Sequence, residues 1–221
     1  YKYRQAFQGV AISTSNNKCI WLLSAYRSDS HASWADWLQS AITDVDWQVL
    51  ELPGRHFRWR IRGNPLSWLH RLPKSKPDLV LATSMVDLAT LRGLHPHIAG
   101  VPVLYYFHEN QFAYPLGKNQ LHSLEPKMVQ LYGALAADRL LFNSEFNRDS
   151  FIRGVDELLE LMPDEVPESI AETLAAKSGV LPVAIDPLPE GEKDPSLILW
   201  NHRWEYDKAP EVFADALTRL K

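Results

Sequence analysis

Short apolar runs alternate with segments of helical spacing along most of this chain, and no other feature constrains the fold as strongly. A strand, a helix and a second strand in succession form a βαβ unit, in which the two strands lie parallel. Parallel sheets are covered by helices on both faces, so their strands are apolar throughout. The sequence therefore predicts an α/β fold with a Rossmann-like parallel sheet. We expect strands at 19–23, 47–52, 78–82, 101–107 and 139–142, and helices starting at Asp29 or Ser30 and over 66–72, 86–94, 126–137 and 145–161.

An acidic, proline-rich segment marks a boundary near the end of the chain. Residues 186–195 contain three prolines, one glycine and four acids, a composition typical of interdomain linkers. A strand-like run precedes it at 180–186, and a further strand and helix follow at 196–200 and 210–220. We expect a disordered leader at 1–18, an N-terminal domain at 19–186, a linker at 187–195 and the first βα unit of a second domain at 196–221. Because the chain starts with Tyr1 and stops at Lys221 inside a helical pattern, we also expect it to be a fragment.

The cysteine content and the length of the apolar runs bear on the compartment. Cys19 is the only cysteine, so it cannot form an internal disulfide or a cysteine-based zinc site, which favours a reducing compartment. No run approaches the roughly 18 apolar residues of a membrane span. Residues 1–18 also lack the apolar core of a signal peptide. We therefore expect a cytoplasmic protein without a membrane partner.

A basic segment stands out against the net charge of -4. Residues 55–76 contain seven Lys or Arg and no Asp or Glu. At a period of two, Arg58, Arg60 and Arg62 would share one face of a strand, and Phe57, Trp59 and Ile61 the other. Arginines interleaved with aromatic side chains suit the phosphates and unstacked bases of a nucleic acid, and Arg55 extends this candidate set. The alternative is a basic edge strand that its charge keeps soluble.

Four polar residues follow the apolar run that ends at Phe107. They are His108, Glu109, Asn110 and Gln111, which together offer acid, base, donor and acceptor groups. The carboxyl ends of strands are where open α/β sheets bind ligands. The alternative is an ordinary turn that caps the next helix. We interpret the segment as a functional site, with His108 and Glu109 as the candidate catalytic residues and Asn110 and Gln111 as candidate substrate-binding residues.

Two further polar pairs close predicted strands. Asn143 and Ser144 follow the fifth strand, and both residue types are common helix caps. Ser30 and His31 follow the first strand, where a sugar or phosphate can bind at the start of a helix. No glycine lies between residues 24 and 31, so the G-x-G-x-x-G fingerprint is absent and hydride transfer from a nicotinamide cofactor loses support. We place all four residues in a candidate substrate site.

A polar loop follows the predicted strand at 196–200. It contains Arg203 and Lys208, a spacing that suits the two phosphates of a diphosphate. The alternative is a solvated loop in which Glu205 and Asp207 pair with the two cations. The chain has no P-loop, no G-x-S-x-G elbow and no H-E-x-x-H, and its histidines show no metal-ligand spacing. We expect neither a metal nor a cofactor.

These segments, in this order, resemble the tRNA-queuosine α-mannosyltransferases over about residues 19–221. The string Phe-His-Glu-Asn-Gln at 107–111 and the string His-Arg-Trp-Glu-x-Asp-Lys at 202–208 are highly specific together. The resemblance implies a GT-B architecture of two Rossmann-like domains. It also implies transfer of mannose from GDP-mannose to queuosine in the anticodon of tRNA-Asp, with retention and without a metal. The matching segments are Ser24-Ala25-Tyr26, Ser30-His31, Leu52-Pro53, Arg58-Trp59-Arg60, Tyr106 to Gln111, Phe142-Asn143-Ser144 and His202 to Lys208.

The resemblance also implies roles for single residues. Arg203 and Lys208 would bind the donor diphosphate, and His108 would lie near the transferred sugar. The basic segment would contact the anticodon arm. Many members have glycines where this chain has residues 27–29, and the family's donor site continues beyond Lys221, so we expect the chain alone not to turn over. Two alternatives remain: a GT-B transferase acting on a lipid or glycan, and a non-catalytic tRNA-binding half-domain.

Overall fold

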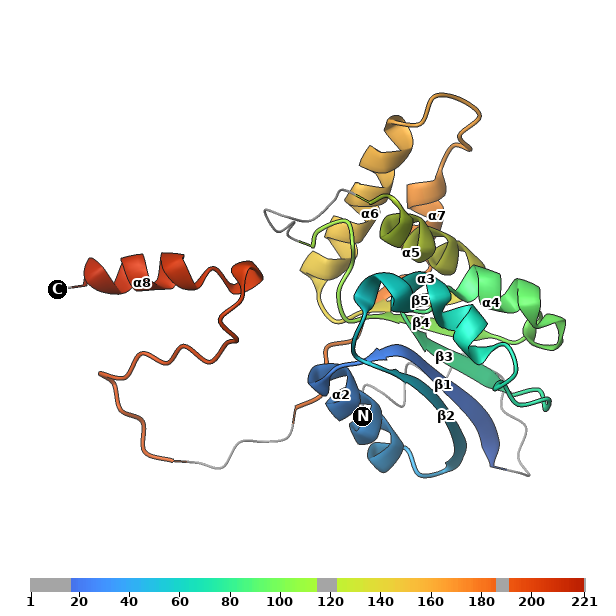
Figure 1. The fold of residues 1–221 in the computed structure, drawn as a ribbon, viewed down its shortest axis with the longest axis horizontal. Coiled ribbons are helices and arrows are strands. Elements are labelled where there is room, and N and C mark those ends of the chain that lie inside the picture. Colours follow the sequence, from blue (N-terminus) through green and yellow to red (C-terminus); the bar gives the residue numbers. More distant parts are fainter. Residues whose placement is uncertain (1–16, 115–122, 186–190, 221) are drawn as a thin grey trace. The chain divides into compact units, whose positions relative to one another are not determined.

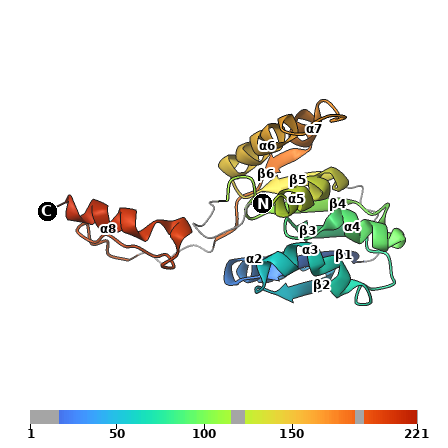
Figure 2. The ribbon, with the colours of Figure 1, turned by 45° about the horizontal axis from the view of Figure 1, so that its top comes forward.

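The computed structural model describes residues 17–114, 123–185 and 191–220, and it confirms an α/β, Rossmann-like architecture. The described residues form one six-stranded sheet in which every pair of neighbouring strands is parallel, in the order β2-β1-β3-β4-β5-β6 (Figures 1 and 2). The chain divides into a unit that ends at Ala184 and a second that begins at Ile185. The strands are β1 (Lys18–Arg27), β2 (Val45–Pro53), β3 (Leu79–Thr83), β4 (Val103–Phe107), β5 (Arg139–Phe142) and β6 (Ser178–Val180).

The helices of the first unit cover the two faces of the sheet unequally. Apolar side chains of α3 to α7 pack with one face, whereas the core on the other face contains side chains of α2, including Trp34 and Leu38. The helices are α2 (Asp29–Ala41), α3 (Phe57–Trp68), α4 (Leu88–Leu94), α5 (Glu125–Ala136), α6 (Glu145–Glu160) and α7 (Ile170–Ala176), with a 3₁₀ turn at Pro96–Ile98. The second unit contains a 3₁₀ turn at Tyr206–Lys208 and α8 (Pro210–Thr218).

Strand β4 sends alternate side chains to the two faces. Tyr105 and Phe107 lie in the core under α3 to α7, and Leu104 and Tyr106 lie in the core under α2. All of these side chains are buried, as expected for an internal parallel strand. The same alternation carries the next residue, His108, to the α2 side of the sheet.

Most of residues 55–68 form a helix, so the strand that both interpretations of the basic segment assumed was wrong. Helix α3 begins at Phe57, well before the expected start at residue 66. Its buried positions 61, 64, 65 and 68 follow a spacing of three and four, which is helical. Pro65 lies inside the helix and cannot donate to the carbonyl of Ile61, but the Asn64 side-chain amide does, at 3.2 Å. This substitution for the missing bond lets the helix continue past the proline.

Other expectations also need correction. Residues 196–200 form no strand, and Leu197, Ile198 and Leu199 are exposed. The last strand of the sheet lies at Ser178–Val180 rather than at 180–186, and α7 was not anticipated. The N-cap position of α2 is Ser28 rather than Asp29 or Ser30, and the Ser28 side chain makes no capping hydrogen bond to the helix backbone. Lys18, which we placed in the leader, is the first residue of β1, while residues 1–16 lie outside the described part of the chain.

Candidate active site

His31 and Glu109 meet at the carboxyl edge of the sheet. His31 lies in the first turn of α2, after β1, and Glu109 lies in the loop that follows β4. The Nε2 atom of His31 is 3.4 Å from Oε2 of Glu109, and its Nδ1 atom is 2.8 Å from Oγ of Ser28. His31 is buried, whereas the Glu109 side chain is 32% exposed. The solvent-facing Glu109 carboxylate is therefore held by the buried His31 imidazole, and the Ser28 hydroxyl in turn fixes the orientation of that imidazole.

His108 lies beside this pair in a shell of rings. Its ring centroid is 4.2 Å from that of His31, 4.7 Å from that of Trp34 and 4.9 Å from that of Tyr106. Its Nε2 atom is buried and has no hydrogen-bond partner among the described residues. Burial, and secondarily the charge of His31, holds the pKa of His108 well below its usual value. The His108 imidazole is therefore neutral at neutral pH. Its buried Nε2 atom still lacks a hydrogen-bond partner among the described residues.

Asparagine side chains fix the backbone that carries His108. The Asn143 Nδ2 atom donates to the His108 carbonyl at 2.6 Å. The Asn147 Nδ2 atom donates to the Phe107 carbonyl at 3.1 Å and to Oδ1 of Asn143 at 2.9 Å. These bonds tie the loop after β4 to the loop after β5 and to the first turn of α6. The predicted residue Asn143 thus lies at the site, with its amide engaged by protein groups.

The buried side chain of Asn110 also stabilises the loop that follows β4. Its Nδ2 atom lies 3.0 Å from the Asn147 carbonyl, 2.8 Å from Asn147 Oδ1 and 3.0 Å from Oγ of Ser150. Its Oδ1 atom accepts from the backbone N–H groups of Phe112 and Ala113. The side chain is buried, and the backbone N–H of Gln111 donates to Oε1 of Gln130 at 2.7 Å. Of the four residues after β4, His108 and Glu109 therefore line the site. The Asn110 side chain and the Gln111 backbone N–H hold the loop in place.

The two predicted serines have different environments. Ser144 caps α6, and its Oγ atom accepts from the backbone N–H of Asn147 at 3.1 Å. This is the capping role that the sequence left open as an alternative. Ser30 lies next to His31 on the first turn of α2 and is exposed. It is therefore free of the core but adjacent to the His31–Glu109 pair.

The two cations predicted to bind a diphosphate belong to the second unit. Arg203 Nη1 lies 3.2 Å from Oε1 of Glu205, and Lys208 Nζ lies 3.0 Å from Oδ2 of Asp207. These are the pairings that the solvated-loop alternative anticipated. The Oδ1 atom of Asp207 is buried without a partner among the described residues. Helix α8 follows directly, with Pro210 in its first turn.

The four arginines predicted to bind tRNA, at positions 55, 58, 60 and 62, do not share one face, because α3 is a helix. Arg62 pairs with the buried carboxylate of Asp87, and the Arg60 Nε atom donates to the Pro53 carbonyl at 3.3 Å. Arg55 and Arg58 are exposed and have no acidic partner among the described residues. Of the four arginines predicted to bind tRNA, Arg55 and Arg58 are therefore the two that can meet an external anion without breaking a contact described here.

The start of α3 lies close to the candidate site. The ring of Phe57 contacts that of Tyr26, with centroids 6.1 Å apart, and Tyr26 contacts His31 at 6.4 Å. Tyr26 lies near the end of β1 and Phe57 is the first residue of α3. The basic segment and the His31–Glu109 pair therefore occupy the same edge of the sheet.

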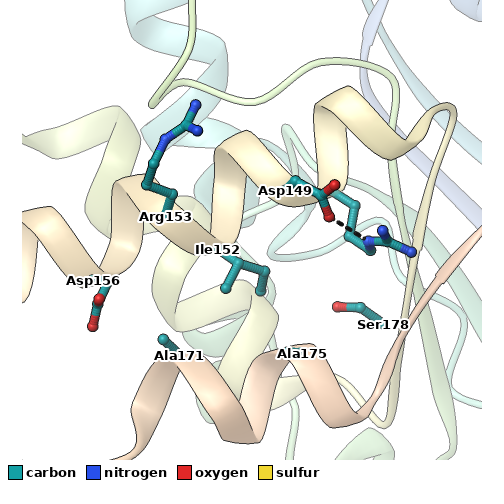
Figure 3. A pocket seen from close by; sticks show the side chains of 8 residues that line it. Asp149, Ile152, Arg153, Asp156, Ala171, Ala175 and Ser178 are labelled. Carbon is teal, nitrogen blue, oxygen red and sulfur yellow. Dashed lines mark hydrogen bonds and ion pairs between the residues drawn. The ribbon is translucent and has the colours of Figure 1, made fainter.

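An open pocket of about 460 Å³ lies elsewhere, between α6, α7 and the start of β6. Figure 3 shows Ile152 pointing between the two helices, whereas Arg153 points away from α7. Among its charged side chains, Arg148 pairs with Asp149 at 2.7 Å, and Arg153 lies 3.8 Å from Glu157. None of the residues predicted to act lines this pocket.

The described ranges contain neither a metal-binding cluster nor a membrane-spanning helix. Within 17–114, 123–185 and 191–220, no group of three or more His, Cys, Asp or Glu side chains could hold a metal ion. In the same ranges, no helix has the length and apolar character needed to cross a membrane.

Comparison with known proteins assigns the family. Residues 19–185 match the family model described as tRNA-queuosine alpha-mannosyltransferase N-terminal. Over 216 residues the chain is 32% identical to a Drosophila melanogaster protein named tRNA-queuosine alpha-mannosyltransferase. The chain belongs to the tRNA-queuosine alpha-mannosyltransferase family. The match with the Drosophila protein covers 91% of this chain and 57% of that protein, so the chain spans a little over half the length of this relative.

Sequence reasoning missed several residues that build the site of this family member. Ser28 orients His31, Trp34 and Tyr106 enclose His108, and Asn147 holds the backbone of the loop. The position of Ser28, three residues before His31, is a signal that could have been read as a cap facing the imidazole. Trp34 lies a further three residues along and so shares the face of α2 with His31.

Proposed function

We propose that this chain supplies the acceptor side of a GT-B glycosyltransferase that moves mannose from GDP-mannose to queuosine in the anticodon of tRNA-Asp, with retention. Membership of the family supports the reaction class. The observation that carries the proposal is the partly exposed Glu109 carboxylate, held by buried His31 beside a neutral His108 at the carboxyl edge of the sheet. Hydroxyl groups need acceptors and neutral donors of this kind to be oriented.

The residues of this edge would orient the reacting sugar and the acceptor. The Nε2 atom of His108 has no partner among the described residues, and a side-chain movement that exposes this buried atom would let it bond to a hydroxyl of the transferred sugar. The Glu109 carboxylate can accept from a hydroxyl of the queuosine cyclopentenediol. Ser30, which precedes His31 and is exposed, and Gln111, two residues after Glu109, are the further candidates for substrate contact. The surrounding rings keep water from the His108 side.

The bond changes require no side-chain nucleophile. The bond between the anomeric carbon and the diphosphate oxygen breaks, and the acceptor hydroxyl oxygen bonds to that carbon from the same face. The hydroxyl proton passes to the departing phosphate oxygen. The negative charge that develops on the diphosphate needs cations in the absence of a metal. We assign this role to Arg203 and Lys208, which would exchange their internal acidic partners for phosphate oxygens.

The test is a nucleoside analysis of tRNA-Asp from cells that lack the gene. We expect mannosyl-queuosine to disappear and unmodified queuosine to accumulate, and the wild-type gene to restore the mannosylated form. Glu109→Gln should fail to restore it. Glu157→Gln, which replaces an exposed carboxylate on α6, should restore it fully.

The opposite results have distinct meanings. Unchanged tRNA nucleosides in the deletion strain would refute the tRNA acceptor and favour a lipid or glycan acceptor. Full rescue by Glu109→Gln would leave the reaction in place but refute the role of this carboxylate.

A further inference from the structure

Trp59 presents one face of its indole to solvent while Gly63 supports the other. Trp59 lies in the first turn of α3 and is 50% exposed, although the alternating pattern placed it on a packed face. A Cβ atom added to Gly63 would lie 2.7 Å from each of three atoms of the indole, Cδ2, Cε2 and Cε3. Because these atoms all belong to the six-membered ring and are equally distant, the ring lies flat over the glycine. Any side chain at position 63 would lift it.

The exposed ring is surrounded by cationic residues. Arg55 and Arg58 are exposed and have no acidic partner among the described residues, and no Asp or Glu lies between residues 55 and 76. Arg62, one turn after Trp59, is also half-exposed, although it pairs with Asp87. A flat aromatic surface within a positive field matches an unpaired base attached to a phosphate backbone.

This surface lies beside the candidate active site. Phe57, two residues before Trp59, contacts His31 through Tyr26. A nucleotide whose base reaches the His31–Glu109 pair would therefore have its neighbours in the chain close to the first turn of α3. The exposed indole, together with Arg55 and Arg58, which have no acidic partner among the described residues, favours RNA over a protein partner as the occupant.

We propose that Trp59 is a stacking platform for an unpaired base of the tRNA anticodon loop, next to the nucleotide that reacts. This inference rests on the proposed function. Gly63 supports the ring from below, and Arg55 and Arg58 bind the phosphates on either side of the stacked base. Stacking depends little on base identity, so the platform contributes affinity and register and leaves the choice of nucleotide to the catalytic edge.

The test measures binding of the 221-residue chain to the anticodon stem-loop of tRNA-Asp, with an abasic nucleotide placed at each loop position in turn. Trp59→Ala should weaken binding to the intact loop about 5- to 150-fold, the range that corresponds to the loss of one base–aromatic stack. One abasic position should weaken wild-type binding to the same extent and cause no further loss in Trp59→Ala, because both changes remove one contact.

Four further variants separate stacking from other effects. Trp59→Phe should retain most of the affinity, whereas Trp59→Leu should not, because leucine is apolar but cannot stack. Gly63→Ala should weaken binding with Trp59 still present. Leu66→Ala, which removes an exposed apolar side chain two turns along α3, should bind as the wild type does. Circular dichroism melts confirm that each variant is folded.

Four results would refute the proposal that Trp59 stacks on a base. Equal affinities of wild type and Trp59→Ala, or losses that add at every abasic position, would overturn the platform while leaving tRNA binding intact. Loss of affinity in Leu66→Ala as large as in Trp59→Ala would indicate general apolar docking and would also overturn it. If the wild-type chain binds no RNA at all, the RNA-binding part of the proposed function falls, and this inference with it.

Discussion

Replacing Asn110 by aspartate should destabilise the fold more than replacing it by alanine, although aspartate has the same shape as asparagine. The Asn110 amide nitrogen faces three oxygen atoms, two on Asn147 and one on Ser150, at 2.8–3.0 Å. The Ser150 hydroxyl can rotate to donate to a carboxylate. The two Asn147 oxygens cannot, and turning the Asn147 amide would break its bonds to Phe107 and Asn143.

The magnitudes follow from what each change leaves unpaired. Asn110→Ala leaves the half-buried N–H groups of Phe112 and Ala113 without an acceptor, at about 1–3 kcal/mol for each fully buried group. Partial access to water places the total near 2–3 kcal/mol. Asn110→Asp keeps the bonds from the N–H groups of Phe112 and Ala113. It also buries a negative charge beside the two Asn147 oxygens, which can only accept hydrogen bonds. An uncompensated buried charge costs about 3–5 kcal/mol.

The pH dependence of the aspartate variant makes the prediction sharper. Burial against acceptors raises the pKa of the introduced carboxyl above its unfolded value of about 3.9. Its protonated form can donate as the amide does, so the deficit relative to wild type should shrink as the pH falls. The deficit of Asn110→Ala should not change with pH, because alanine does not titrate.

Urea unfolding monitored by circular dichroism, at matched pH values between about 4.5 and 8, gives the free energies of unfolding. Asn17→Asp, at an exposed position, is the matched control and should be neutral. The reasoning fails if Asn110→Asp is as stable as wild type at neutral pH, or if its deficit is independent of pH.

Two further perturbations test other parts of the first unit. The folded pKa of His108 lies below its unfolded value of 6.5, so the folded state binds fewer protons and stability should fall as the pH drops below 6.5, by up to about 1.4 kcal/mol per pH unit. His108→Phe should remove that slope in urea unfolding, and an unchanged slope would contradict the assignment. Gly133→Ala would place a Cβ atom 2.6 Å from the hydroxyl of buried Tyr105 and should destabilise by about 1–3 kcal/mol. Gly93→Ala, in a helix with open space around it, should instead stabilise by about 0.5–1 kcal/mol, and a thermal melt in which the two variants agree would refute this account.

The sheet could be predicted from the sequence because its signals are local. Four of the first five strands contain a continuous apolar run, whereas β2 alternates apolar and polar residues, and each of the five was found within a few residues of its expected bounds. The prediction for residues 55–62 failed because a short alternation fits both periods. Extending the window to Trp68 would have shown the helical spacing of Ile61, Asn64 and Trp68, but Gly63 and Pro65 argued against a helix.

The strand expected at 196–200 failed for a different reason. A strand is stabilised by hydrogen bonds to a neighbouring strand, and the described part of the second unit contains no other strand. Apolar composition alone cannot supply that partner.

The candidate site was predictable in its residues but not in its contacts. His31, His108 and Glu109 could be named because they follow strands whose carboxyl ends meet at one edge. Their pairing depends on how α2 packs against β4 through Trp34 and Tyr106, which stack at 4.5 Å. This packing is set by residues far apart in the chain, so no local pattern indicates it.

The loop that carries His108 and Glu109 is held by carboxamides and backbone groups rather than by ion pairs. Asn110, Asn143 and Asn147 have no ionisable proton in the range where proteins are folded. Salt and moderate changes of acidity, which weaken charged contacts, therefore leave this support unaltered. A pH profile of the transferase should then report the protonation of the groups that face substrate, and not a movement of the loop beneath them.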